Sequence, residues 1–91
     1  MIKIKINGIV QGVGFRPFIF RLATEMNLKG YVLNSSAGVE IEAIGENLET
    51  FVKRIQNEAP PASQIDEISH QFTEDKIYEN FTIKKSKSNE G

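Results

Sequence analysis

Apolar and polar residues change their spacing several times along the chain, and each change predicts a new element. In "MIKIKING", Ile2, Ile4 and Ile6 alternate with lysine and asparagine, a period of two that predicts a strand with one buried face. From residue 15 to residue 26 the apolar spacing becomes three and four, which predicts a helix with Pro17 in its first turn. The apolar stripe of this helix consists of Phe15, Phe18, Ile19, Leu22, Ala23 and Met26.

Extended patterns return after Gly30. "YVLN" and "GVEIEAI" flank the turn-forming "SSAG", so residues 31–44 are expected to form a hairpin. A second helix follows, with Asn47 expected to cap its first turn and "APPAS" to end it. Its apolar stripe consists of Leu48, Phe51, Val52 and Ile55.

The last third of the chain predicts two more strands. Residues 65–72 alternate imperfectly, because Ile65 and Ile68 are three apart, which indicates a bulge or an offset start. "NFTIKK" offers a short final strand. The predicted class is therefore α+β, a ferredoxin-like split βαββαβ sandwich: one antiparallel sheet, two helices on one face, and a short extra C-terminal strand. We expect one domain over residues 1–84 and a mobile tail or truncated linker over residues 85–91.

Composition narrows the function classes. The 91 residues include no cysteine, which excludes disulfides and cysteine-ligated metals, and we expect no metal and no cofactor. The formal charge of −1 favours neither nucleic acid nor an acidic membrane as a partner. No apolar run approaches the roughly 18 residues of a membrane span, and the N-terminus lacks a signal-peptide pattern. A cytoplasmic domain, monomeric when isolated, is expected.

The stretch "VQGVGFRPF" lies between the first predicted strand and the first helix. Glycines at positions 12 and 14 let backbone N–H groups converge, and a helix N-terminus attracts anions. Arg16 can bind two oxygens of one phosphate, although a cation at this helix end opposes the helix dipole. The combination predicts a cradle for a phosphoryl group. A tight turn followed by a solvated arginine is the plainer alternative.

Two other glycine motifs do not fit. Pro17 occupies the third glycine position of the dinucleotide-binding fingerprint, and the chain is too short for that fold. No Gly-Lys-Ser/Thr follows the loop, so a P-loop is excluded as well.

"GIVQGVGFR" resembles the signature of acylphosphatases. The likeness continues with "GYVLN", which places Asn34 at the family's spacing from Arg16, and with "PPASQIDEI"; it covers about residues 2–83. The resemblance implies that Asn34 orients the attacking water and that Arg16 holds the phosphate of an acyl phosphate together with loop amides. The implied phosphate-binding residues are Gln11, Gly12, Val13, Gly14, Phe15 and Arg16.

"GFRPF" and "N-x-x-x-G-V-E-I" resemble one branch of this family, the N-terminal domain of the carbamoyltransferases that mature [NiFe] hydrogenases. That branch implies carbamoyl phosphate as substrate and later domains of a longer protein as partners. The ending "FTIKKSKSNEG" is similar to the lead into that branch's zinc-binding modules, so we expect a sequence cut before them. Ala37 stands where stand-alone acylphosphatases usually have aspartate.

The other candidate residues are expected to have structural roles and not catalytic ones. His70 lies on a strand pattern and is expected to be structural, and Glu40 with Glu42 to form the wet side of the hairpin. Phe15, Phe18 and Phe51 are expected in the core. An RNA-binding domain would need aromatic residues on its central strands, and these are absent. A hydrolase, a phosphate-binding or docking module with little turnover, and a stand-alone acylphosphatase remain as alternatives.

Overall fold

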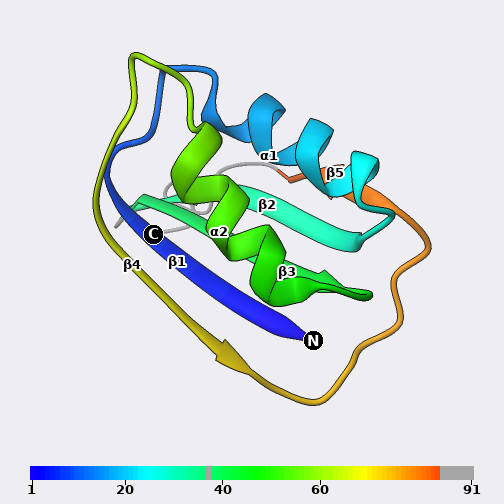
Figure 1. The fold of residues 1–91 in the computed structure, drawn as a ribbon. Helices are drawn as coiled ribbons and strands as arrows, with labels where there is room; N and C mark the ends of the chain where they lie inside the picture. The colour runs from blue at the N-terminus through cyan, green and yellow to red at the C-terminus, as the bar shows by residue number, and fades with distance from the viewer. Residues whose placement is uncertain (37, 85–91) are drawn as a thin grey trace.

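The computed structural model describes residues 1–36 and 38–84, which form one five-stranded sheet and two helices. The elements are β1 (Ile2–Ile9), α1 (Phe15–Glu25), β2 (Lys29–Ser35), β3 (Gly38–Ile44), α2 (Leu48–Glu58), β4 (Gln64–Phe72) and β5 (Phe81–Ile83). The strand order is β4-β1-β3-β2-β5, and both helices lie on the same face of the sheet (Figure 1). The predicted ferredoxin-like order is confirmed. Residue 37 and the predicted tail, 85–91, lie outside the described residues.

The four long strands pair in antiparallel fashion, as expected, whereas β5 pairs with β2 in parallel and makes the sheet mixed. The hairpin begins at Lys29, two residues before its predicted start, so Gly30 lies inside β2. A Cβ on Gly30 would meet the Glu42 carbonyl oxygen at 1.9 Å, and this close approach of the backbones explains the glycine.

The predicted irregularity in β4 is a bulge. Asn7 pairs with Glu67 but Gly8 pairs with Ile65, so Asp66 is an extra residue on the edge strand. Gly8 has φ 132°, and a Cβ there would meet the Gln64 carbonyl oxygen at 2.1 Å. The broken alternation in the sequence thus marks where the β4 backbone bends towards β1.

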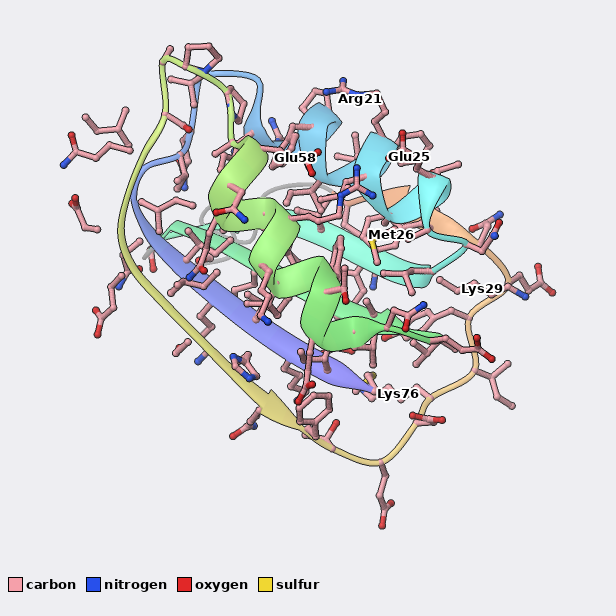
Figure 2. All side chains as sticks on the ribbon, viewed as in Figure 1. Arg21, Glu25, Met26, Lys29, Glu58 and Lys76 are labelled. Atoms are coloured by element: carbon pink, nitrogen blue, oxygen red, sulfur yellow. The ribbon has the colours of Figure 1, made fainter. Side chains whose placement is uncertain are left out.

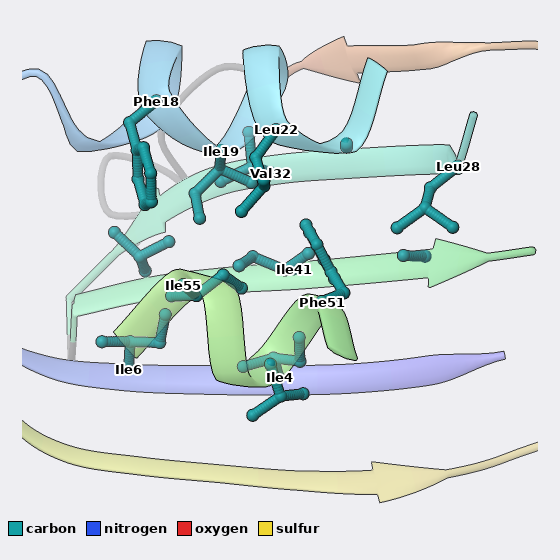
Figure 3. Packing of buried hydrophobic residues seen from close by; sticks show 14 of the residues in the cluster. Ile4, Ile6, Phe18, Ile19, Leu22, Leu28, Val32, Ile41, Phe51 and Ile55 are labelled. Carbon is teal, nitrogen blue, oxygen red and sulfur yellow. The ribbon is translucent and has the colours of Figure 1, made fainter. Parts of the chain in front are cut away.

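The core lies between the sheet and the helix stripes. Figure 3 shows Ile19 and Leu22 of α1 and Phe51 of α2 packed in one layer with strand residues such as Val32 and Ile41. Phe15, Phe18 and Phe51 are buried, as predicted, and the first two rings meet edge to face at 5.6 Å. Alternation in the strands and a three-to-four spacing in the helices therefore predict most of this core, while Val10 and Leu28 join it from connecting segments.

The two helices are also linked at the surface. The Arg54 guanidinium donates to Glu58 Oε2 at 2.7 Å on its own helix and to Glu25 Oε1 at 2.9 Å on α1; Figure 2 labels both acids. Such exposed pairs contribute little to stability individually. Within the described part of the chain, no helix is long and apolar enough to cross a membrane.

The expected side-chain cap by Asn47 is wrong. Asn47 stands at the N-cap of α2, but with φ 60° and ψ 39° it is left-handed, and its side chain makes no capping hydrogen bond. A capping side chain requires an extended N-cap backbone that aims its oxygen at the first free amides. The left-handed backbone turns the Asn47 side chain away from them.

Candidate functional site

The loop after β1 and the end of β2 lie at the same end of the sheet. Both strands run antiparallel to β3, so they are parallel to each other and their carboxyl ends coincide. The first of these ends continues into loop residues 10–14 and the N-terminus of α1, and the second carries Asn34. The fold therefore brings together two predicted site segments that are distant in sequence.

The loop takes a conformation that favours glycine. Gly12 has φ 75° and Gly14 has φ 80°, both left-handed, and a Cβ at either position would meet nothing within 4 Å. Glycine is thus required by the backbone angle and not by lack of space. Val10 and Phe15, at the two ends of the loop, are each 1% exposed and anchor it in the core.

The N-terminus of α1 lacks the usual compensation for its dipole. Gly14 is the N-cap and supplies no side chain, and the first turn contains no acidic residue. Arg16 lies half-buried in this turn and makes no ion pair with the residues that the structure describes. Unsatisfied amides, a helix dipole and an arginine are thus concentrated at one point, an arrangement that can hold an anion.

The Gln11 side chain joins this loop to the β2–β3 hairpin. Gln11 Nε2 donates to the Ser35 carbonyl oxygen at 2.8 Å and to the Gly38 carbonyl oxygen at 2.9 Å. Sequence reasoning placed Gln11 among the phosphate-binding residues and did not foresee this contact. Its acceptors are main-chain carbonyls more than twenty residues away, and no sequence pattern marks them.

Asn34 has a side-chain oxygen without a protein partner. The residue pairs with Val39 and lies on the helix-covered face, like Val32. Its Oδ1 is buried and accepts no hydrogen bond from the described residues. Because buried polar atoms are nearly always hydrogen-bonded, this oxygen is notable at the same end of the sheet as the loop predicted to bind an anion. It is available to accept a hydrogen bond from a water molecule or a ligand.

A second polar cluster lies on the other face of the sheet and corrects one expectation. Glu42 does not belong to a wet face: it is 8% exposed. The Tyr78 hydroxyl donates to its Oε1 at 2.7 Å, and the ammonium groups of Lys3 and Lys76 lie 3.8 and 3.6 Å from the carboxylate. We call these residues, with Tyr31 beside Tyr78, the Glu42 cluster. The segment after β4, in which Lys76 is labelled in Figure 2, covers Glu42, so strand alternation could not reveal its burial.

The groups around Glu42 shift its titration. Burial acts to raise the pKa of Glu42, but the phenols of Tyr78 and Tyr31 and the two lysines outweigh it, so the pKa lies below its ordinary value. Burial, then the adjacent carboxylate, raises the pKa of Tyr78 to about 12. The cluster therefore contains an ionised carboxylate whose charge is fully compensated.

The remaining candidate, His70, pairs with Ile4 of β1 and lines the same hollow as Tyr31 and Glu42. It is exposed on the edge strand β4, with its ring edge-on to Phe72 at 5.8 Å. Among the described residues, no group of three or more histidine, aspartate or glutamate side chains could hold a metal ion.

Known proteins resemble this chain over nearly its whole length. The family model described as acylphosphatase matches residues 2–83. The chain is 49% identical to carbamoyltransferase HypF2 of Cupriavidus necator over 77% of its own length and 9% of that protein's. It is 45% identical to an acylphosphatase of Thermotoga petrophila, covering 91% of this chain and 94% of the relative.

A solved structure shows the same fold. The chain superposes on full-length HypF, in a phosphate- and nucleotide-bound form, with a TM-score of 0.89 and 47% identity; the match covers 94% of this chain and 12% of HypF. The predicted resemblance to the HypF branch is thereby confirmed. The chain spans only about a tenth of the HypF proteins that it matches.

Proposed function

Because the chain belongs to the acylphosphatase family, we propose that it binds an acyl phosphate at the loop between β1 and α1 and hydrolyses it. The amides of residues 11–15 and the Arg16 guanidinium hold the phosphoryl oxygens. Asn34 orients the attacking water. Phosphoryl transfer needs mainly positioning and charge stabilisation, which backbone amides and one arginine supply without covalent chemistry.

The observation that carries this proposal is the buried, unpartnered Oδ1 of Asn34 at the same end of the sheet as the loop. An amide oxygen can accept a hydrogen bond from the water and leave the water's lone pair aimed at phosphorus. In line with that attack, the bond from phosphorus to the acyl oxygen breaks and the carboxylate leaves with the electron pair. The water's protons go to the phosphate product and to solvent. A carboxylate is a good leaving group, so no general acid is required.

Carbamoyl phosphate is the proposed natural substrate. The support is the 49% identity to a protein named carbamoyltransferase and the 47% identity to HypF crystallised with phosphate. On the same basis we propose that the domain acts in the cytoplasm during [NiFe]-hydrogenase maturation, next to later domains of a HypF-like protein. A domain boundary at residue 84 is part of this proposal.

The test is phosphate release from benzoyl phosphate and carbamoyl phosphate, with phosphoserine as the control. We expect turnover of both acyl phosphates. No turnover is expected for the ester, whose alkoxide leaving group needs an acid that the site does not supply. Inorganic phosphate, measured by calorimetry, should compete with the substrates.

A phosphate-binding or docking module is the second candidate. The small share of the HypF length that the chain covers favours it, because chemistry in such proteins can reside in other domains. Phosphate binding without release of phosphate from either acyl phosphate would support this module and contradict the hydrolase.

A further inference from the structure

The loop at the anion site is held by its two buried ends, by Val13, which packs partly against the core, and by one side-chain amide. Val10 and Phe15 anchor those ends, while Gly12 and Gly14 contribute no side chain. Between the anchors, the hydrogen bonds that described residues make to another element come from the Gln11 side chain. Val13 also packs against the core, so the Gln11 amide is the polar link that fixes the loop relative to the rest of the site.

The two acceptors of Gln11 lie opposite each other in the hairpin. Ser35 on β2 pairs with Gly38 on β3, so the Gln11 amide bridges both strands where they turn. This part of the hairpin is firmly held: Ser35 is 5% exposed, and a Cβ on Gly38 would meet the Ile6 carbonyl oxygen of β1 at 2.0 Å. Gln11 thus attaches the glycine-containing loop to the closely packed strand ends at Ser35 and Gly38.

Asn34 directly precedes Ser35. A hydrogen bond to the Ser35 carbonyl constrains the peptide that joins Ser35 to Ser36, directly after the residue assigned to hold the water. We propose that Gln11 is a positioning residue, which sets the orientation of Asn34 relative to the phosphate held by the loop. Its catalytic role rests on the proposed function, whereas its bridging role does not.

The chemistry explains why the position is glutamine. Both acceptors are carbonyl oxygens, so the task needs two N–H donors on one atom at the end of a side chain of this length. Methionine has a similar length and no such donor. Gln11→Met therefore removes the bridge while leaving the loop glycines and Arg16 in place.

The kinetic experiment compares four variants of the chain. These are Gln11→Met, Asn34→Ala, the double variant, and Gln56→Met on the exposed face of α2 as the matched control. Gln11→Met should lower kcat roughly tenfold to a hundredfold, the scale expected for a misplaced reacting group, with phosphate affinity changed less than about threefold. In the Asn34→Ala background the same substitution should change kcat less than about twofold, because its effect passes through Asn34. The control should match the parent.

A second measurement does not depend on turnover. Phosphate titration followed by amide NMR should shift both the loop glycines and the Ser35 and Gly38 amides in the parent. In Gln11→Met, only the loop signals should still respond.

Three outcomes would overturn the proposal: parental kcat and parental coupling in Gln11→Met, loss of phosphate affinity as complete as in Arg16→Ala, or effects of Gln11 and Asn34 that simply add. A parent that couples loop and turn but hydrolyses nothing would contradict the proposed function and leave the bridge standing.

Discussion

The Arg16–Asn34 site and the Glu42 cluster are both polar, yet they are opposite in almost every other respect. The Glu42 carboxylate has a tyrosine hydroxyl and two lysines as partners and belongs to the face of the sheet away from the helices. Asn34 Oδ1 has no partner among the described residues and lies on the helix-covered face. Satisfied polar groups hold a structure together, whereas an unsatisfied group beside a cation is ready for a ligand. Substitutions at the two places should therefore separate activity from stability.

The largest effect is expected at Arg16. Arg16→Ala should abolish measurable phosphate binding, weakening it by roughly a hundredfold or more, because it removes the charged side chain assigned to the anion. Calorimetry with inorganic phosphate gives the affinity, and thermal unfolding gives the stability, which should equal or exceed that of the parent. Unchanged affinity would place the site elsewhere.

Asn34→Ala should lower turnover by roughly 10²–10³-fold, the scale for losing one oriented polar group at a transition state. Phosphate affinity should remain close to that of the parent, because the proposed role of Asn34 is to hold the water and not the anion. Rates of phosphate release from benzoyl phosphate test this. If affinity falls as completely as in Arg16→Ala, the division of roles is wrong.

The order of the strands and helices, and most of the residues in the core, could be predicted from the sequence. Alternation in 2–9 and 38–44 and the two helical stripes are local signals, and even the β4 bulge follows from the spacing of Ile65 and Ile68. Apart from the cap expected at Asn47, the failures concern interactions between residues far apart in the chain. The burial of Glu42 depends on Tyr78, and the contact of Gln11 depends on carbonyls of the hairpin.

Parts of the candidate site could likewise be predicted from local sequence, and other parts could not. The cradle follows from glycines, a helix start and an arginine within a few residues. The part played by Asn34 came from a family resemblance, because one asparagine near the end of a strand has many possible uses. Only the folded chain reveals that its oxygen is buried without a partner.

At the Glu42 cluster, stability should change instead of activity. Glu42→Gln keeps the size of the side chain but removes its charge from two lysines and a hydroxyl, which should cost about 1–2 kcal/mol of unfolding free energy. Urea denaturation measures this loss, and phosphate affinity should remain parental. Equal stability of variant and parent would show that the charge contributes nothing.

The contribution of the Glu42 cluster to stability should fall both in acid and in alkali. Since folding lowers the pKa of Glu42, its contribution is complete above the unfolded value of about 4.3 and is lost as the pH falls through the lower folded pKa. Since folding raises the pKa of Tyr78 to about 12, its contribution is lost as the pH rises from about 10 towards that value. Chemical denaturation of parent and Glu42→Gln across pH should show the two variants converging under acid.

The smallest effect is expected for the polar C-terminal segment of the sequence. Removing residues 85–91 should change the unfolding free energy by less than about 0.5 kcal/mol, because the polar segment carries no apolar stripe. Residue 84 must be kept, since its amide donates to the Val32 carbonyl at 2.9 Å and its ammonium lies 4.1 Å from the Tyr31 ring centroid. Urea denaturation of the shortened chain tests the proposed boundary.

The pairing of β1 with β4 has a consequence for how quickly this chain reaches its native state. The first strand is bonded on one side to the hairpin and on the other to a strand near the opposite end of the described chain, with Ile2 facing Phe72. Closing so large a loop has to precede the gain from the ladder, and folds rich in such pairings complete the reaction on the order of milliseconds to seconds. Stopped-flow refolding should therefore show β4 docking late, after the helices and hairpin have formed.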